Sequence, residues 1–351
     1  MTSRRGGPRP VRSLPVPTHA RRHECARRNR ECFSWRPAAA ESLTWRTASP
    51  HPQAVLLATW NVNSVMARLP RLLEWLDATG PDVLCLQETK VADGAFPTAE
   101  VAALGYEVAA NGGGRWNGVA ILSRVGLDAV TAGFTGEPGF PEVEARAVSA
   151  TCAGVRVWSV YAPNGRELEH PHYAYKLAWL AALRDALRTE LGAGDQLAAC
   201  GDFNIAPTDD DVWDPAEFAG STHVSAPERA ALRALLELGL SDVQPRALKG
   251  RPFSYWDYRA GMFHKGMGMR IDLVLLSRAL ASRVTDAYIA REARKGTAPS
   301  DHAPVVVGVA TESRAGAGRP TGCAPPSGGR WARESPGRQA GPGTHGGGVS
   351  R

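Results

Sequence analysis

The sequence predicts an α/β fold in which two β-sheets pack face to face with helices on their outer sides. Residues 54–90 alternate an apolar segment, a segment of helical periodicity and a second apolar segment, which is typical of α/β layers. Short apolar segments with Gly and Pro turns between them fill 106–163, a pattern that favours antiparallel strands. Two amphipathic segments and further strand-like segments follow, so each set of strands has helices next to it in the sequence.

The expected strands are short apolar segments bounded by Gly, Pro or polar residues. "AVLLATWN" opens the series, and Pro81 precedes the second segment, "PDVLCLQETK". The last third of the chain consists mostly of such segments. We expect strands, in chain order, at 54–61, 81–90, 106–111, 118–124, 144–152, 155–163, 196–204, 253–259, 270–277, 284–290 and 303–309.

The expected helices place apolar residues at helical spacing. The segment 68–80 ends at Gly80, and 170–191 is a long amphipathic helix. The helix at 225–240 has the best-marked start: Ser225 can cap it, a proline fits its first turn, and Glu228 completes a capping box.

The chain divides into one domain and two tails. Nothing within 54–310 has the composition of a linker, and no internal repeat is present, so we expect a single domain there. Residues 1–53 hold eleven Arg and three Glu, a net charge of +8, and the Gly-, Pro- and Arg-rich 311–351 carries +4. Since the whole chain carries +6, the domain carries −6. Tails of this kind are typically disordered, and they can also add nonspecific affinity for a polyanion.

The cysteines favour a reducing compartment. Their spacings match no zinc pattern, and Cys85, Cys152 and Cys200 fall in apolar strand-like segments, which predicts buried reduced thiols. We therefore expect the protein to be cytoplasmic. No run of 18 apolar residues is present, and no apolar region follows the paired arginines near the N-terminus, so neither a membrane span nor an export signal is expected.

Polar side chains gather where the predicted strands end. Each alone is weak evidence, because a lone carboxylate is usually solvated and "GDFN" has the composition of a turn. Their joint occurrence favours one shared site, because sites are built from loops at one rim of a scaffold. The set comprises Asn61, Glu88, Tyr161, Asp202, Asn204, Asp272, Asp301 and His302.

The residue types in this set favour a hard metal ion. No G-x-S-x-G motif occurs, and Ser300 is too close in sequence to His302 to be an obvious nucleophile. Zinc prefers several His or Cys ligands, and only one histidine lies at these strand ends. Carboxylates and amides suit Mg²⁺ or Mn²⁺, so the residues predict metal-assisted hydrolysis of a phosphoester.

The motifs that carry these residues resemble a known family. "TWNVNS", "LQETK", "YAPNG", "GDFNIAPTDDDVWDP", "SYWDYR", "RIDLVLLS" and "SDHAPV" occur in the order of the exodeoxyribonuclease III and apurinic/apyrimidinic endonuclease family. That family belongs to the endonuclease/exonuclease/phosphatase group. The resemblance covers essentially all of 54–310 and neither tail, and it implies that this range is a catalytic domain with a four-layer α/β sandwich of two mixed sheets flanked by helices.

The resemblance implies a metal site built on Glu88. This residue would be the principal Mg²⁺ ligand, with Asn61 and Asp301 as further ligands, and Mn²⁺ could substitute. Some relatives carry Asp where this chain has Asn63. The contribution of Asn63, and the choice between one metal ion and two, therefore stay open.

The resemblance also implies the catalytic roles. Asp202 would orient and deprotonate the attacking water, and Asn204 would position it or hold a phosphate oxygen. His302 would bind the scissile phosphate, with Asp272 fixing its tautomer, and Tyr161 would contact the same phosphate. These roles agree with the charge that develops on phosphate oxygens during hydrolysis.

DNA contacts are expected around this site. Arg115 and Trp116 would track the backbone and stack on a base, but a plain exposed turn is nearly as good an interpretation. Lys90 could hold a phosphate or pair with Glu88. Tyr255, Met269 and Ile271 resemble an apolar pocket for a flipped abasic sugar, but Met269 and Ile271 could equally be core packing. The expected contacts are Lys90, Arg115, Trp116, Asn164, Arg166, Tyr255, Met269 and Ile271. Candidate rim cations are Arg115, Arg166, Lys249, Arg251, Lys265 and Arg270.

Together these features predict a monomeric, Mg²⁺-dependent DNA-repair nuclease. It would cut duplex DNA on the 5′ side of abasic sites, degrade it from 3′ ends and trim 3′ blocking groups. Two alternatives stay open: a hydrolase of the same fold that acts on RNA, an inositol phosphate or a phospholipid, and an inactive DNA-binding relative.

Overall fold

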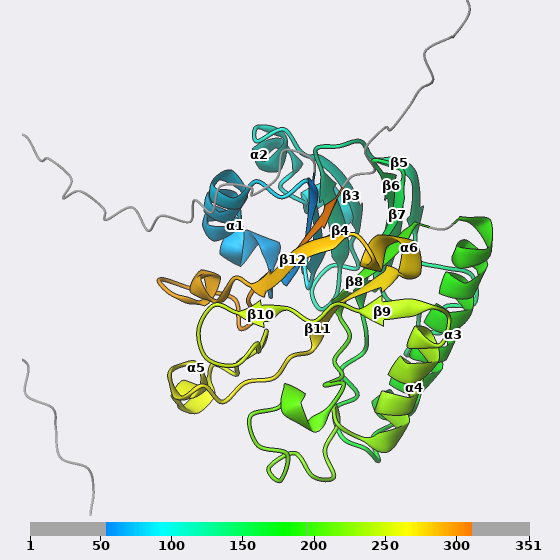
Figure 1. Ribbon diagram of the computed structural model, residues 1–351, viewed down its shortest axis with the longest axis vertical. Helices are drawn as coiled ribbons and strands as arrows, with labels where there is room; N and C mark the ends of the chain where they lie inside the picture. The colour runs from blue at the N-terminus through cyan, green and yellow to red at the C-terminus, as the bar shows by residue number, and fades with distance from the viewer. Residues whose placement is uncertain (1–53, 195, 311–351) are drawn as a thin grey trace, which may run out of the picture. The chain divides into compact units, whose positions relative to one another are not determined.

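The computed structural model describes residues 54–194 and 196–310. Our expectations for the two tails, 1–53 and 311–351, lie outside the described residues. In the described part the strands form two sheets, one of seven strands and one of six (Figure 1).

The seven-stranded sheet is mixed. Its central strands β1 and β2 are parallel, whereas β13 pairs with β1 antiparallel. In spatial order the sheet contains β10 (Arg246–Ala247), β12 (Val284–Ile289), β13 (Val305–Ala310), β1 (Ala54–Asn61), β2 (Val83–Gln87), β4 (Val119–Ser123) and β3 (Glu107–Asn111).

The six-stranded sheet is also mixed. Its strands β7 and β8 are parallel, and β11 pairs with β8 antiparallel. In spatial order it contains β5 (Asp128–Ala132), β6 (Ala147–Cys152), β7 (Val155–Tyr161), β8 (Leu197–Asp202), β11 (Asp272–Ser277) and β9 (Leu240–Asp242).

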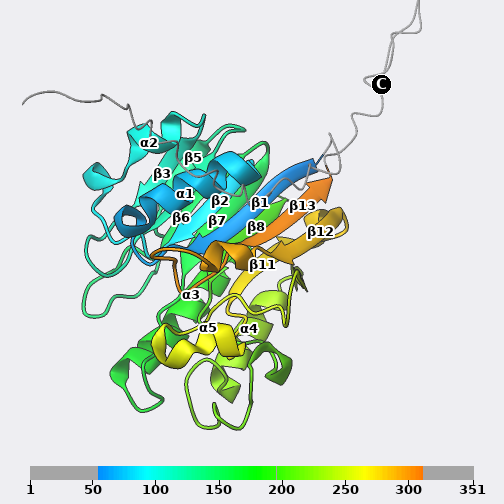
Figure 2. The same cartoon turned by 90° about the vertical axis from the view of Figure 1, so that its left-hand side faces the viewer.

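The helices lie mainly on the outer faces of the sheets (Figures 1 and 2). The α-helices are α1 (Val65–Thr79), α2 (Thr98–Ala102), α3 (Pro171–Ala193), α4 (Ala226–Leu236), α5 (Met262–Lys265) and α6 (Arg278–Ala281). Short 3₁₀ helices are η1 (Asp93–Ala95), η2 (Asp209–Asp211), η3 (Arg259–Gly261) and η4 (Arg291–Arg294).

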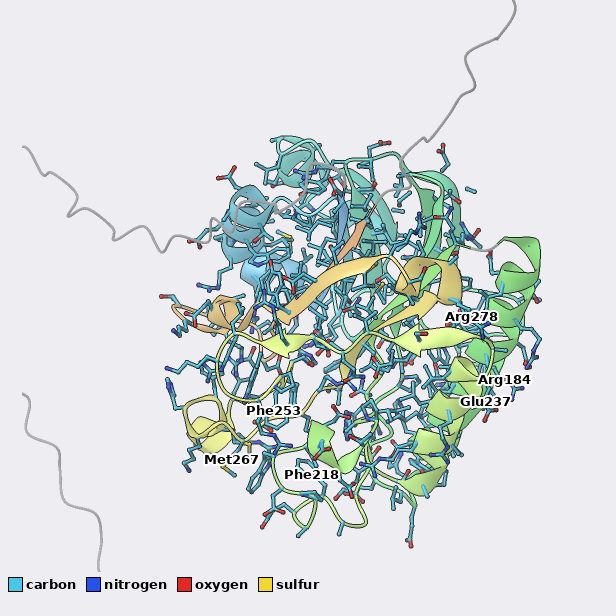
Figure 3. The ribbon with its side chains drawn as sticks, viewed as in Figure 1. Arg184, Phe218, Glu237, Phe253, Met267 and Arg278 are labelled. Atoms are coloured by element: carbon cyan, nitrogen blue, oxygen red, sulfur yellow. The ribbon has the colours of Figure 1, made fainter. Side chains whose placement is uncertain are left out.

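Three apolar clusters hold four layers together. One lies between the two sheets and includes Ile121 and Val274. A second packs α3 and α4 on the six-stranded sheet around Trp179, and a third packs α1 on the seven-stranded sheet around Trp60 and Trp75. Side chains fill the space between these layers (Figure 3). The predicted four-layer sandwich is therefore confirmed.

Helix boundaries follow the capping signals in the sequence. Gly80 adopts left-handed φ 57° and donates its N–H to Leu76 O at 2.9 Å, which ends α1. The capping box at the start of α4 is formed: the Ser225 hydroxyl accepts the Glu228 backbone N–H, and the Glu228 carboxylate accepts the Ser225 backbone N–H.

The expectation of a strand at 253–259 is wrong. Tyr255 makes only isolated bridges, to Met269 and to His302. This segment is a loop whose apolar side chains are buried: Phe253 and Trp256 insert into the core between the sheets. The backbone N–H of Trp256 donates to the backbone oxygen of Asp301 at 2.9 Å, so this loop contacts and stabilises the segment before β13.

Two further expectations can be compared with the described residues. Cys85, Cys152 and Cys200 are buried free thiols, as predicted. Between 54 and 310, residue 195 excepted, no helix combines the length and apolar character that a membrane crossing needs.

Strand direction brings the polar residues to one edge. Parallel β1 and β2 end together, and antiparallel β13 begins beside the end of β1. In the other sheet, parallel β7 and β8 end together and β11 begins beside them. Residues far apart in the sequence therefore meet at the same end of the sandwich.

Candidate active site

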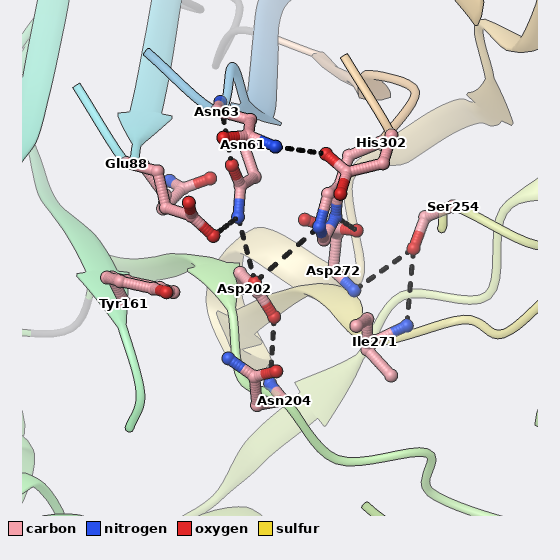
Figure 4. A network of polar contacts seen from close by, with 12 residues as sticks. Asn61, Asn63, Glu88, Tyr161, Asp202, Asn204, Ser254, Ile271, Asp272 and His302 are labelled. Carbon is pink, nitrogen blue, oxygen red and sulfur yellow. Dashed lines mark hydrogen bonds and ion pairs between the residues drawn. The ribbon is translucent and has the colours of Figure 1, made fainter. Parts of the chain in front are cut away.

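Asn61 joins the two sheets at the centre of the site (Figure 4). Its side-chain amide nitrogen donates to Glu88 Oε1 at 2.8 Å and to Asp202 Oδ2 at 3.0 Å. Its Oδ1 accepts the Asn63 N–H at 3.0 Å, which fixes which end of the amide faces the carboxylates. Asn61 therefore presents two donors to the two acidic residues of the site.

The six-stranded sheet places three functional residues in one row. Asp202 is the direct register partner of Tyr161 on β7 and of Asp272 on β11. Neighbouring strands put such partners about 5 Å apart, so the row has a spacing suited to one phosphate group.

His302 is oriented by Asp272. Its Nδ1–H donates to Asp272 Oδ2 at 2.7 Å, while Nε2 lies 3.9 Å from Asp202 Oδ2 and is left for a ligand. Desolvation lowers the pKa of His302, but Asp272 and then Asp202 outweigh it and raise the pKa to about 10. The ring is therefore an imidazolium at neutral pH, as an anion-binding group must be.

Asp301 and His302 face different partners. Asp301 Oδ1 accepts from Asn63 Nδ2 at 3.1 Å, whereas His302 pairs with Asp272. The Ser300 hydroxyl donates to Asn61 O at 2.6 Å and fixes the loop that carries both residues. Although adjacent in sequence, the Asp and the His are not a hydrogen-bonded pair.

Lys90 occupies a cation position beside Glu88. Its ammonium lies 2.7 Å from Glu88 Oε2 and 2.6 Å from Asn63 Oδ1. Desolvation raises the pKa of Glu88, but Lys90 and Asn61 outweigh it, so the pKa is lowered. Lys90 thus pairs with the carboxylate, one of the two roles that the sequence left open.

The oxygen donors around Glu88 fit a divalent cation. Ligand-type atoms of Glu88, Asp202 and His302 lie within 4.8 Å of one another, and the two carboxylates of this group are the cation-binding members, because His302 is protonated. Carboxylate and amide oxygens from Glu88 and Asn63 already surround the Lys90 ammonium. Hard oxygen donors around a cation position suit Mg²⁺ or Mn²⁺. Asp301 is not part of this group, but it is linked to it through Asn63.

Asp202 is placed to accept a proton. Desolvation raises its pKa, His302 lowers it, and Asp272 and Glu88 raise it again, to about 7. A carboxylate poised near neutrality can take a proton from water during the reaction. Tyr161 keeps its proton, because desolvation and then Glu88 raise the pKa of the phenol well above its usual value.

Asn204 is held with one amide orientation. Its Nδ2 donates to Ala162 O at 3.0 Å, and its Oδ1 accepts from Asn164 Nδ2 at 3.2 Å. The Asn164 amide is itself oriented, because its Oδ1 accepts the Arg166 N–H at 3.0 Å. The loops after β7 and β8 are therefore linked through their amides.

The predicted DNA contacts fall into two classes. Trp116 is 71% exposed with the Arg115 guanidinium 5.5 Å from its ring, so both lie on an open turn. Met269 and Ile271 are buried in an apolar cluster with Tyr255 packed against them. The Tyr255 ring lies 4.9 Å from the His302 ring, which places this cluster beside His302.

Arg270 is not a rim cation, contrary to expectation. It is 2% exposed, and its guanidinium bonds Asp211 and Asp242. Its side chain points into the interior of the protein, toward these two carboxylates. A buried arginine needs such partners, so Arg270 is structural.

Several residues that support the site gave no signal in the sequence. The Ser254 hydroxyl accepts the Asp272 N–H at 3.1 Å. The Arg146 guanidinium lies 4.7 Å from the Tyr161 ring. Lys176 and Glu228 form an ion pair below the Asn204 loop. The capping box identified Glu228 only as a helix start, and nothing marked its second role.

Comparison with known proteins agrees with this geometry. Residues 58–302 match the endonuclease/exonuclease/phosphatase family. The chain is 32% identical over 262 residues to exodeoxyribonuclease III of Haemophilus influenzae, covering 70% of this chain and 97% of that protein.

Two solved structures are similar over the same region. The 3′ phosphatase NExo from Neisseria, bound to a product DNA hairpin, has TM-score 0.69 and 39% identity, covering 72% of this chain and 98% of that one. An AP endonuclease from Archaeoglobus fulgidus has TM-score 0.67 and 36% identity, with 72% and 98% covered. The family match spans all the strand-end residues described above. The chain therefore belongs to the endonuclease/exonuclease/phosphatase family, within its exodeoxyribonuclease III and AP endonuclease group.

Proposed function

We propose that this protein is a Mg²⁺-dependent DNA-repair nuclease. It hydrolyses the phosphodiester on the 5′ side of abasic sites, degrades duplex DNA from 3′ ends and removes 3′ blocking groups. The observation that carries the proposal is the convergence of Glu88, Asp202 and His302 within 4.8 Å at one end of the sandwich. Relatives named for exodeoxyribonuclease, AP endonuclease and 3′ phosphatase activity support the three substrates.

Three residues act on the scissile phosphate and the attacking water. The His302 imidazolium binds a nonbridging oxygen through Nε2, because Nδ1 is held by Asp272. The Tyr161 phenol donates to the same phosphate. Asp202 accepts the proton of the attacking water as the new P–O bond forms and the bond to the leaving 3′-oxygen breaks. That oxygen takes a proton from solvent water, so the product carries a 3′-hydroxyl.

Glu88, Asn61 and Asp301 are the proposed magnesium ligands. When bound, the ion supplies positive charge at the phosphate and leaving oxygens. The Lys90 ammonium lies 2.7 Å from Glu88 Oε2 and neutralises part of its charge. A carboxylate whose pKa is lowered stays ionised and available for the cation.

The DNA contacts follow from the position of each side chain relative to this site. Arg115 and Trp116 lie on an exposed turn, where a guanidinium and an indole can meet backbone and base. Asn164 and Arg166 follow β7 and would hold phosphates next to the scissile one. Tyr255 with Met269 and Ile271 would receive a flipped sugar. We also propose that the protein acts as a monomer in the cytoplasm.

A panel of matched duplexes tests this function. One duplex carries an abasic site, one a recessed 3′ end and one a 3′-phosphate, each incubated with Mg²⁺ or with chelator. We expect Mg²⁺-dependent products from all three. An inositol phosphate and an RNA duplex serve as rival substrates. Preferential turnover of either would favour the alternative function, a hydrolase of the same fold that acts on another phosphoester.

Paired variants separate the site from general effects on the fold. Glu88→Gln should lose metal-dependent cleavage, whereas Glu237→Gln, an exposed glutamate after α4, should behave as wild type. Both should keep the wild-type melting temperature. Full cleavage by Glu88→Gln would refute the metal assignment, and wild-type protein that binds DNA without cutting it would favour the inactive relative.

A further inference from the structure

A fully buried ion pair lies beneath the active site. Lys176 on α3 and Glu228 on α4 are both 0% exposed and contact each other directly. Burying two charges costs several kcal/mol per ion, roughly, unless their hydrogen-bonding groups are all satisfied. A pair in this position therefore calls for a role beyond joining two helices.

The Lys176 ammonium connects two active-site loops. Besides Glu228, it donates to Asn204 O at 2.7 Å and to Asn164 O at 3.1 Å. Its three hydrogens thus have three acceptors. Since Asn204 follows β8 and Asn164 follows β7, one cation fixes the backbone of both loops.

Glu228 anchors the ammonium from the other side. Its Oε1 accepts from Thr222 Oγ1 at 2.7 Å and from the His223 N–H at 2.9 Å, and its Oε2 accepts from Ser225. The His223 ring then lies against Asn204, with Nε2 3.0 Å from Oδ1. The carboxylate therefore ties a third loop to the same centre.

The loops adopt conformations that need such support. Asn204 has φ 51° and Arg166 has φ 61°, both in the left-handed region. That region costs a non-glycine residue on the order of 1–3 kcal/mol unless its surroundings hold it. At Gly165 a Cβ would lie 2.8 Å from Thr222 Oγ1 and 3.2 Å from Lys176 Cδ, so the chain closes tightly over the lysine.

We propose that Lys176, fixed by Glu228, is a positioning residue for the reaction. It holds the backbone of Asn164 and Asn204 so that their amides face the scissile phosphate, and it does not touch the substrate itself. The reaction is hydrolysis of the scissile phosphodiester, so this inference rests on the proposed function.

Two variants separate positioning from stability. Lys176→Met leaves a buried carboxylate without its cation and should lower the melting temperature. Lys176→Met/Glu228→Gln removes both charges, and the glutamine oxygen can still accept the Ser225 N–H, so the melting temperature should recover in part; the His223 N–H loses its acceptor. Cleavage should not recover, because the Asn164 and Asn204 carbonyls still lack the ammonium.

Cleavage is measured in single turnover with enzyme in excess, so that only folded, bound enzyme is observed. Both variants should be slower by about 10²-fold, the usual cost of a misplacement near 1 Å. In an Asn164→Ala/Asn204→Ala background, Lys176→Met should add little further loss, since the lysine acts through these two amides. A double variant that regains wild-type cleavage together with its melting temperature would overturn the inference.

Backbone hydrogen exchange tests the inference without activity. Residues 162–166 and 203–206 should exchange faster in the double variant while α3 stays protected. The matched control is Arg246→Met/Asp286→Asn, an exposed ion pair, which should change neither exchange nor rate. Wild-type protein that cuts no DNA would defeat the proposed function alone, and unchanged exchange in the two loops would defeat the inference alone.

Discussion

His302 contacts two carboxylates at different distances, and this difference defines its role. Asp272 lies 2.7 Å from Nδ1 and Asp202 lies 3.9 Å from Nε2. The near carboxylate orients the ring and raises its pKa, and the far one lies beyond hydrogen-bond distance of Nε2, which on the proposed function binds the phosphate. The site thus separates orientation from substrate binding with two aspartates on neighbouring strands.

Asp272→Asn should lower the pKa of His302 and free its ring from the fixed orientation. Desolvation lowers the pKa of His302 and Asp272 is the largest influence that raises it, so the variant's pKa falls. We expect a loss of about 10²- to 10³-fold, as for removal of one charged group at a reacting oxyanion. The high-pH limb of the pH–rate profile should move from near 10 to lower pH, because the imidazolium is lost earlier while Asp202 still needs a pH near or above 7 to act as a base. A pH–rate profile that matches wild type would contradict this role.

Sequence motifs predicted the residues that meet at the site, but not all of their partners. Glu88, Asp202 and His302 lie at strand ends in chain order, a signal that sequence carries. Lys176 lies within an amphipathic helix, where a lysine normally faces solvent. Only the packing of α3 against the loops after β7 and β8 shows that it is buried, and the burial of Arg270 is equally a tertiary effect.

At the scale of elements, the start of α3 depends on a neutral histidine. The Gly165 N–H donates to His172 Nδ1 at 3.1 Å, which requires that nitrogen to be unprotonated. Desolvation, followed by Arg146 and Arg166, lowers the pKa of His172 from 6.5 to about 4. The unfolded chain therefore binds the proton more readily between these two values.

The contribution of His172 to stability should therefore fall as pH decreases from 6.5 toward 4, opposite to that of Asp202, and it is measured as the difference from a variant without this histidine. The slope from one such group is at most about 1.4 kcal/mol per pH unit. His172→Asn keeps an acceptor near the Nδ1 position and removes the titration, so its melting temperature should depend less on pH. Thermal unfolding across this range measures the effect, and parallel curves for the two proteins would show that His172 does not contribute.

The pairing of β7 with β8 requires glycine at 201. A Cβ at Gly201 would lie 1.9 Å from Val160 O on the paired strand. Gly201→Ala should therefore push β8 away from β7 and destabilise the fold by about 1–3 kcal/mol, the usual cost of overpacking. Because Asp202 is the next residue, cleavage should fall as well.

Gly192→Ala is the matched control. This glycine in α3 has open space around a Cβ, so alanine there should keep or slightly raise stability. Equal melting temperatures for the two variants would show that the close approach at Gly201 is tolerated.

Secondary structure was predictable where local signals and tertiary pairing agree. The capping residues Ser225 and Gly80 mark helix ends that the structure reproduces. The prediction of a strand at 253–259 is wrong because alternation of apolar residues predicts that side chains are buried, not that the backbone pairs with another strand. Trp256 is buried in a loop, where Tyr255 makes isolated bridges to Met269 and His302 in place of a strand pairing.

At the scale of the whole molecule, charge is unevenly distributed along the chain. Residues 1–53 carry +8 in a protein whose total is +6. Deleting them should leave the melting temperature almost unchanged and weaken DNA binding at low salt, because fewer counterions are released. Binding measured against salt concentration gives the slope for each protein. A large drop in melting temperature would show that the segment belongs to the fold.

On the proposed function, Glu88, Asn61 and Asp301, at strand ends of the seven-stranded sheet, hold a divalent cation against the scissile phosphate, which residues of the six-stranded sheet also contact. An abasic duplex with sulfur at a nonbridging oxygen of that phosphate tests this contact, because Mg²⁺ binds oxygen ligands and Mn²⁺ tolerates softer ones. We predict slow cleavage of one sulfur diastereomer in Mg²⁺ and recovery in Mn²⁺. Equal cleavage of sulfur and oxygen substrates in Mg²⁺, or cleavage that persists in chelator, would contradict the account.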